Sequence, residues 1–280
     1  MAPRRTTLSQ LLEHYDAVLL DAYGVLVDAR GALPATAALF AELARRGKPY
    51  QIVTNDASRS PTTYARRFAG YGIAIPGERI TTSGSLLPGY FRANGLEGAR
   101  TCVLGTDDSI AYVVAGGGVI MPLAAGMEID ALAVCDDAGT PFLDGIELAL
   151  SAVVRAVEAG RRPALIAPNP DLVYPKGGGE LGVTAGAMAL VIEAAIARRF
   201  PGHDLVFARL GKPAPDLFVE AKRRLGLERV VMIGDQLETD IAGAIAAGVD
   251  SALLESGISR WEPRATITPT YLLDSLAVHP

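Results

Sequence analysis

The chain has 280 residues, half of them hydrophobic, and a formal net charge of −5. This length is typical of two domains with sizeable cores, and the acidic balance argues against a nucleic-acid partner, which requires a basic face. No apolar segment follows the arginines near the start, and glycines and a proline interrupt the uncharged stretch 109–127. We therefore expect no signal peptide and no membrane span. The two cysteines lie in apolar runs typical of buried thiols, which favours a cytoplasmic location.

Strand and helix patterns alternate along the chain, as they do in a doubly wound parallel sheet. Core strands are expected at 17–21, 49–54, 100–105, 229–233 and 250–254, with another near 205–208. We predict an α/β protein with a Rossmann-like catalytic core, residues 1–107 plus 205–280, and an inserted α/β cap domain, residues 108–204. The last cap helix has a nearly continuous apolar face, so it packs against the cap sheet or against a second subunit of a homodimer.

Two polar segments follow the first core strands. Asp21 ends an apolar run, and the chain then turns through Tyr23 and Gly24. A carboxylate at the carboxyl end of a buried parallel strand points into the crevice where such sheets bind ligands, although Asp21 could also simply cap the turn. In the second segment, the Thr54 hydroxyl and the backbone N–H of Asn55 can both donate to a phosphate oxygen. An ordinary polar turn is the alternative for this second segment.

Two further segments carry a lysine and a second pair of carboxylates. Gly211 and nearby prolines hold Lys212 in a constrained loop, where an ammonium can neutralise a carboxylate and a phosphate together. Asp235 ends another buried run, and we expect a helix after it with Thr239 as the N-cap and Asp240 in the first turn. Carboxylates at neighbouring strand ends repel each other unless a cation lies between them, and oxygen ligands suit Mg²⁺. The sequence predicts a magnesium site if the two strands are neighbours.

The segments VTNDASRSP, GKPAPDLF and GDQLETDIAGAIAAGV, in this order after LLDAYG, resemble the haloacid dehalogenase superfamily of phosphohydrolases. Within it the chain looks like subfamily IIA, which includes nitrophenylphosphatase-like and pyridoxal-phosphatase-like enzymes, and the resemblance covers nearly the whole chain. It implies a nucleophile, phosphate-binding residues and Mg²⁺ ligands. These are Asp21 as nucleophile and metal ligand, Thr54 and Asn55 at the phosphoryl group, Lys212 as its neutralising cation, Asp235 as the second metal carboxylate, and Asp240 orienting either metal-bound water or Lys212.

The sequence departs from this family pattern at Tyr23. The phosphatases usually carry a second Asp two residues after the nucleophile, which acts as general acid and base. The backbone carbonyl of Tyr23 can still bind Mg²⁺, but a phenol with a reference pKa near 10 is poorly matched to protonating a leaving group. General acid–base catalysis typically contributes about 10²–10⁴ in rate. We therefore expect a weak phosphatase, or one that acts on esters with good leaving groups, and the chain resembles a branch of subfamily IIA with an aromatic residue here.

Substrate choice is expected in the cap, because the core motifs handle only the phosphoryl group. Subfamily IIA members have an Asn-Pro-Asp loop that faces the active site, and the matching candidates here are Asn169 and Asp171. A plain Asn-Pro turn is the alternative. The expected partner is a small phosphorylated metabolite.

Two other functions stay open. A catalytically impaired protein that binds a phosphorylated metabolite is favoured by Tyr23, whereas the retained Asp21, Lys212 and Asp235 favour an enzyme. The Asp-Ala-Tyr-Gly string also resembles true haloacid dehalogenases. Those enzymes place a helical cap between the nucleophile and the second motif, an interval that here must already hold a helix and a strand. The long interval lies instead between Thr54 and Lys212, so dehalogenation is the less favoured alternative.

Overall fold

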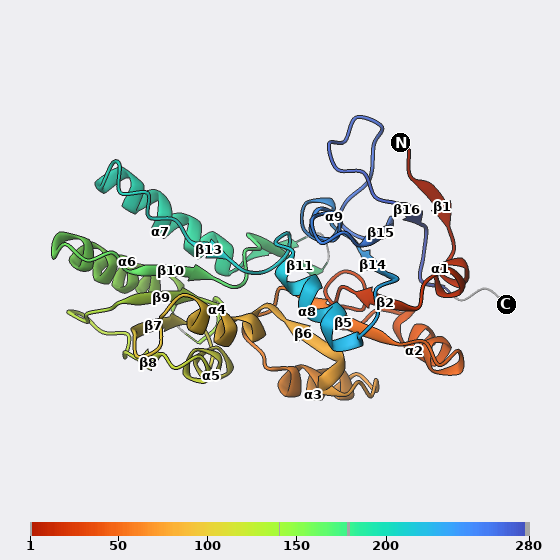
Figure 1. The fold of residues 1–280 in the computed structure, drawn as a ribbon, viewed down its shortest axis with the longest axis horizontal. Helices are drawn as coiled ribbons and strands as arrows, with labels where there is room; N and C mark the ends of the chain where they lie inside the picture. Colours follow the sequence, from red (N-terminus) through yellow and green to blue (C-terminus); the bar gives the residue numbers. More distant parts are fainter. Residues whose placement is uncertain (1, 140, 178–179, 278–280) are drawn as a thin grey trace.

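The computed structural model describes residues 2–139, 141–177 and 180–277. The protein has two bodies that lie side by side, each with its own parallel sheet (Figure 1). The core contains the red, orange and blue ends of the chain, and the cap is formed by the yellow-green to teal middle. This mixed α/β architecture with a Rossmann-like core confirms the predicted fold class.

The core is a seven-stranded sheet in the order β1-β16-β15-β14-β2-β5-β6, and every pairing is parallel. Its strands are β1 (Arg4–Thr6), β2 (Ala17–Leu20), β5 (Tyr50–Thr54), β6 (Ile80–Thr82), β14 (Val230–Gly234), β15 (Asp250–Leu254) and β16 (Tyr271–Leu273). Its helices and turns are α1 (Leu8–His14), α2 (Thr36–Arg45), α3 (Pro61–Gly70), η1 (Gly77–Arg79), α8 (Asp216–Leu225), the π-helical turn η3 (Leu237–Ile241) and α9 (Ala242–Ala246). A short hairpin, β3 (Val27–Asp28) and β4 (Gly31–Ala32), follows β2.

Helices cover both faces of the core sheet. Val18 and Leu20 pack in one apolar cluster with residues of α1, α2 and α3. Ala17 and Leu19, which alternate with them along β2, pack in another cluster with residues of α8 and α9. Because successive side chains of a strand point to opposite faces, all four positions of β2 are buried. The carboxyl edge of the sheet is therefore the place where polar side chains can gather.

The cap is a five-stranded parallel sheet in the order β13-β10-β9-β7-β8. Its strands are β7 (Arg100–Leu104), β8 (Val119–Ile120), β9 (Ala131–Val134), β10 (Ala164–Ala167) and β13 (Ala208–Arg209). The helices α6 (Phe142–Glu158) and α7 (Ala185–Arg199) share one apolar cluster with this sheet, and α4 (Leu87–Ala93) shares another with α5 (Asp107–Ala115). The turn η2 (Ser83–Leu86) leads into α4, and an antiparallel hairpin of β11 (Val173–Gly177) and β12 (Glu180–Val183) extends from the cap.

Two strands expected in the core sheet belong to the cap sheet, so that part of the prediction was wrong. The strand expected at 100–105 is β7, which pairs with β8 and β9, and the strand expected near 205–208 is β13, which pairs with β10. An apolar run indicates a buried strand but not its partner, because the pairing is decided by contacts distant in sequence. We propose cap boundaries near residues 83 and 209 in place of 108 and 204.

Three local expectations also differ from the structure. The cap segment expected as a loop before α7 contains the hairpin β11–β12. Thr239 is not an N-cap, because it lies inside η3, whose N-cap is Gln236. The tail contains β16, which pairs with β1 and β15. A strand of three residues carries too short a pattern to be recognised in the sequence.

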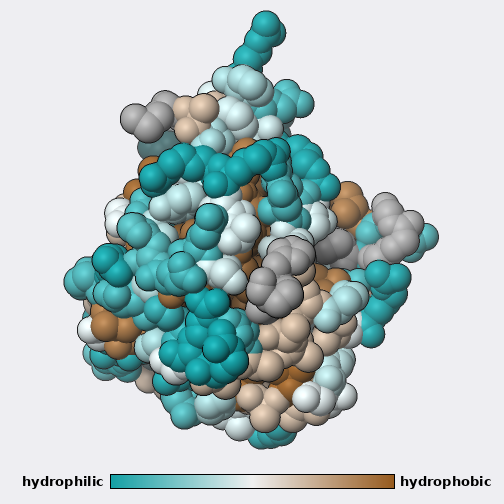
Figure 2. Space-filling model, turned by 90° about the vertical axis from the view of Figure 1, so that its right-hand side faces the viewer, coloured by the Kyte–Doolittle hydropathy of each residue, from teal (hydrophilic) through white to brown (hydrophobic). Residues whose placement is uncertain are grey.

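The described part of the chain contains no helix that is both long enough and apolar enough to cross a membrane. Figure 2 views the core end of the molecule, where hydrophilic residues cover most of the face and hydrophobic residues are scattered. Scattered apolar side chains are normal on a protein surface.

Candidate active site

Three of the predicted site residues, Asp21, Thr54 and Asp235, lie at the carboxyl ends of three adjacent core strands. β2 pairs with β14 on one side and with β5 on the other, which confirms that the strands preceding Asp21 and Asp235 are neighbours. The backbone N–H of Asp21 donates to the carbonyl of Ile233 at 3.0 Å. This hydrogen bond to β14 fixes the start of the loop that carries Asp21. Thr54 is the last residue of β5.

Lys212 lies between two carboxylates. Its Nζ is 2.6 Å from Asp21 Oδ1, 2.6 Å from Asp240 Oδ1 and 3.2 Å from the carbonyl oxygen of Val53. The residue is only 3 % exposed, and burial alone would lower the pKa of Lys212, but the two carboxylates raise that pKa above its usual value. The ammonium therefore stays charged in the site. It can neutralise Asp21 and, next to it, a bound phosphoryl group.

Asn55 holds the loop that carries Lys212. The backbone N–H of Lys212 donates to Asn55 Oδ1 at 2.7 Å, and Asn55 Nδ2 donates back to the carbonyl of Lys212 at 3.0 Å. This side-chain role was not predicted, because the sequence suggested only a backbone contact of Asn55 with phosphate. The peptide bond between Lys212 and Pro213 is cis.

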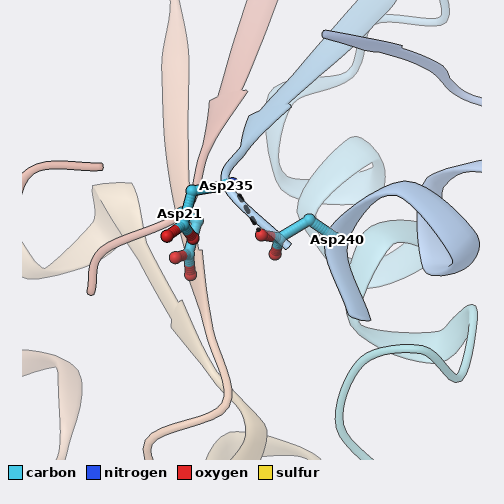
Figure 3. Close-up of side chains that lie close together, drawn as sticks. All are labelled: Asp21, Asp235 and Asp240. Atoms are coloured by element: carbon cyan, nitrogen blue, oxygen red, sulfur yellow. Dashed lines mark hydrogen bonds between the residues drawn. The ribbon is translucent and has the colours of Figure 1, made fainter. Parts of the chain in front are cut away.

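Asp240 is held at both of its oxygens. Oδ2 accepts a hydrogen bond from the backbone N–H of Asp235 at 3.0 Å (Figure 3). Oδ2 also accepts from the backbone N–H of Gln236 at 3.1 Å, and Oδ1 accepts from Lys212. A Cβ atom at residue 234 would overlap the Asp240 side chain, which explains the glycine at that position. Asp240 thus orients both the lysine and the loop that carries Asp235.

Asp235 is fully buried and only half satisfied. Its Oδ2 accepts a hydrogen bond from the backbone N–H of Ile258 at 3.0 Å, whereas Oδ1 has no hydrogen-bond partner in the described structure. Burial and the nearby charge of Asp240 raise the pKa of Asp235 to about 7. Cβ atoms on Gly24 or Gly257 would fall on the Asp235 side chain, so both glycines leave room for this carboxylate.

The acidic side chains suit a divalent cation. Oxygens of Asp21, Asp235 and Asp240 all lie within 4.8 Å of one another, and Figure 3 shows the Asp21 and Asp235 carboxylates side by side. Burial raises the pKa of Asp21 well above its usual value, although Lys212 opposes the shift. A hard cation would relieve the repulsion and satisfy the unpaired Asp235 oxygen. The donor set therefore fits Mg²⁺.

The cap loop that contains Asn169 and Asp171 contacts the core at Asn55. Asn55 Nδ2 donates to Asp171 Oδ1 at 2.9 Å, which links the loop to the residue that holds Lys212. Asn169 Oδ1 accepts from the backbone N–H of Asp171 at 3.1 Å, and its Nδ2 donates to Thr184 at 3.4 Å. Burial raises the pKa of Asp171.

A cavity of about 250 Å³ lies between cap and core and is lined by Thr54, Asn169 and Asp171. Tyr23 lines it too, with its ring edge-on to the cap residue Tyr174 at 6.2 Å between centroids.

The sequence did not identify four core residues that line this cavity, namely Asp56, Arg59, Tyr64 and Arg67. Arg59 lies within the motif that includes Thr54, which could have drawn attention to it. Tyr64 and Arg67 are three residues apart on α3, so they share one helix face, but only the fold shows that this face meets the cavity.

Comparisons with known proteins identify the family of this chain. Residues 18–119 match the family model of haloacid dehalogenase-like hydrolases, and residues 209–278 match a second model described as HAD-hydrolase-like. The chain is 28 % identical to a dihydroxyacetone phosphatase of Corynebacterium glutamicum, over 92 % of this chain and 88 % of that one.

Two solved structures share the fold. A possible sugar phosphatase from Cytophaga hutchinsonii has a TM-score of 0.85 and 29 % identity, with complete coverage of both chains. A glycerol phosphate phosphatase from Mycobacterium tuberculosis in complex with magnesium has a TM-score of 0.77 and 26 % identity, over 95 % of this chain and 77 % of that one. The two family matches together span more than half of the sequence and include every strand end described above. The chain therefore belongs to the haloacid dehalogenase-like hydrolases.

Proposed function

We propose that this protein is a Mg²⁺-dependent phosphatase that hydrolyses a small phosphoester through an aspartyl phosphate on Asp21. The observation that carries this proposal is the Lys212 ammonium shared by Asp21 and Asp240, with the unpaired Asp235 oxygen beside them. Hydrolysis of phosphoric esters is the activity named for the C. glutamicum and M. tuberculosis relatives. We also assign the chain to subfamily IIA, in the branch with an aromatic residue two positions after the nucleophile.

Asp21 is the nucleophile in this mechanism. Lys212 contacts Oδ1, which leaves Oδ2 to attack the phosphorus atom while the bond to the leaving oxygen breaks. The Thr54 hydroxyl and the backbone N–H of Asn55 bind the phosphoryl oxygens, and Lys212 neutralises their charge. Asp21, Asp235 and the backbone carbonyl of Tyr23 would hold Mg²⁺, which would supply Lewis-acid stabilisation of the same charge. Water then attacks the phosphorus atom, the P–O bond to Asp21 breaks, inorganic phosphate leaves with the protons of the water, and the Asp21 carboxylate is restored.

The cap supplies the rest of the substrate site. Asn169 and Asp171 line the cavity beside Thr54, and we propose that they contribute to substrate choice. A cavity of about 250 Å³ is smaller than the roughly 300–1,000 Å³ of sites for drug-sized ligands, which favours a small metabolite. The second candidate function, a binding protein with impaired catalysis, is favoured by Tyr23 in the place of the usual acid.

Replacing the nucleophile separates these functions. Asp21→Asn should lower kcat on an aryl phosphate by at least about 10⁴-fold, because no other group on that strand end can form the acyl phosphate. The fold should remain intact, since Asn has the size of Asp and Lys212 keeps Asp240 as a partner. The matched control is Asp16→Asn, the same substitution at an exposed acid just before the same strand. Substantial residual turnover in Asp21→Asn would rule out the aspartyl phosphate.

Magnesium should raise the melting temperature of the wild type, because it binds only the folded state. At a concentration about 100 times the Kd, the gain is about 2.7 kcal/mol. Asp235→Asn should lose most of this response, whereas Asp16→Asn should keep it. Differential scanning fluorimetry with Mg²⁺ and with chelator makes the comparison. An equal shift in Asp235→Asn and wild type would contradict the metal site.

The loss of rate caused by Tyr23 in place of the usual acid should depend on the leaving group. Nitrophenolate leaves without a proton, whereas an alkoxide needs one, so the wild type should strongly prefer aryl over alkyl phosphates. Tyr23→Asp should reduce this preference, by at most the roughly 10²–10⁴ that general acid–base catalysis supplies. Tyr23→Phe is the control, since it keeps the ring and removes only the hydroxyl. The measurement is kcat/KM for both ester classes, and equal rates in the wild type would show that another residue supplies the proton.

A further inference from the structure

The core wall of the cavity carries a guanidinium without a carboxylate partner. Arg67 donates from Nε to Tyr71 Oη at 3.0 Å and from Nη2 to Tyr23 Oη at 3.3 Å. Its guanidinium also lies 5.4 to 5.9 Å from the ring centroids of Tyr23, Tyr64 and Tyr71. Across residues 2–139, 141–177 and 180–277 no carboxylate forms an ion pair with Arg67, whereas Arg59 on the same wall pairs with Asp56 at 2.7 Å.

This arrangement is unusual for a partly buried charge. Phenols and aromatic faces orient a guanidinium, but they are neutral and leave its positive charge uncompensated. Arginines withdrawn from water are normally paired with an anion, since an unpaired charge in such a place is costly. The missing anion fits a bound molecule, because Arg67 lines the cavity.

Tyr64 provides a second, independent observation on the same wall. The residue is 1 % exposed, and its hydroxyl has no hydrogen-bond partner in the described structure. It lies one turn before Arg67 on α3 and lines the same cavity. A buried hydroxyl left unpaired costs stability, so a group that accepts its hydrogen bond would satisfy it.

We propose that Arg67 and Tyr64 bind a second anionic group, a carboxylate or a second phosphate, on the leaving part of the substrate. This inference rests on the proposed phosphatase activity and narrows its substrate class. Thr54 and Arg67 line one cavity of about 250 Å³, so the phosphoryl group and the second anion belong to one small molecule. The cap wall contributes the carboxylates of Asp136 and Asp137, which favours hydroxyl groups on that side and keeps the anion against α3.

The test compares pairs of esters that differ in one anionic group. The pair 3-phosphoglycerate and glycerol 3-phosphate tests a carboxylate, and the pair propanediol 1,3-bisphosphate and 3-hydroxypropyl phosphate tests a second phosphate. The wild type should prefer the doubly anionic member of at least one pair by about tenfold or more in kcat/KM, because charge-assisted hydrogen bonds are strong. The preferred pair identifies the anion. Equal rates within both pairs would overturn the proposal.

Substitutions on α3 test which of its residues cause the preference for the doubly anionic ester. Arg67→Gln should lower the preference about tenfold or more, chiefly through KM, and Arg67→Lys should keep part of it because the charge remains. Arg66→Gln is the matched control, because Arg66 is the exposed neighbour on the same helix. Tyr64→Phe should lower the preference less and raise the melting temperature, since it removes an unpaired buried hydroxyl. If Arg67→Gln and Arg66→Gln change the preference equally, Arg67 does not bind the anion.

Binding measurements separate this proposal from the proposed function. If the wild type hydrolyses no ester, including p-nitrophenyl phosphate with Mg²⁺, the phosphatase proposal fails. Calorimetric titration of the wild type and Arg67→Lys with the same ester pairs still tests the anion site. Tighter binding of the doubly anionic member by the wild type, weakened in Arg67→Lys, would support the site, and equal binding of both members would refute it.

Discussion

The site depends on one buried ammonium. Lys212 Nζ contacts Asp21 just after β2, Asp240 in η3 and the carbonyl of Val53 in β5. Each of the two carboxylates would be costly to bury alone, because it would lose its hydration without gaining an opposite charge. The ammonium makes the burial of both acids tolerable and thereby keeps Asp21, the nucleophile we propose, in a buried position. It also leaves one carboxylate, Asp235, without a compensating side chain.

Among the described residues, no side chain forms an ion pair with Asp235, and the backbone around its carboxylate leaves room for a cation. Glycines at positions 24 and 257 allow two loops to approach its carboxylate closely, and the N–H of Ile258 satisfies only one of its oxygens. A protein that binds no cation here would be more stable with a neutral residue in place of Asp235, because burial is unfavourable for the charged carboxylate and raises its pKa to about 7. Arg67, which lines the cavity, also has no carboxylate partner among the described residues. Groups of both signs are thus left without a direct opposite charge, as expected where charged ligands complete the electrostatics.

The strand-end residues could be predicted from the sequence, whereas the side of the cavity that α3 forms could not. Asp21, Thr54 and Asp235 each follow an apolar run, and the carboxyl ends of parallel strands lie at one edge of a sheet, so their proximity follows from pattern and topology. The strands near 100 and 208 were assigned to the wrong sheet, since strand pairing is not encoded locally. Arg67 looks like an ordinary charged position on a helix, and only the packing of α3 beside Tyr23 gives it a role.

The contact between cap and core connects substrate recognition to the chemistry. Asp171 of the cap accepts a hydrogen bond from Asn55 Nδ2, and the same amide nitrogen donates to the carbonyl of Lys212. A movement of the cap loop that changed the first bond would therefore act on the loop that positions the ammonium. A third hydrogen bond, from the Lys212 N–H to Asn55 Oδ1, is short and buried, so the Lys212 backbone would stay attached to Asn55 while its surroundings shifted. The cap thus contacts the candidate site through the Asn55 amide as well as through the ring of Tyr23, and a substrate bound between cap and core would act on the residue that holds the Lys212 loop.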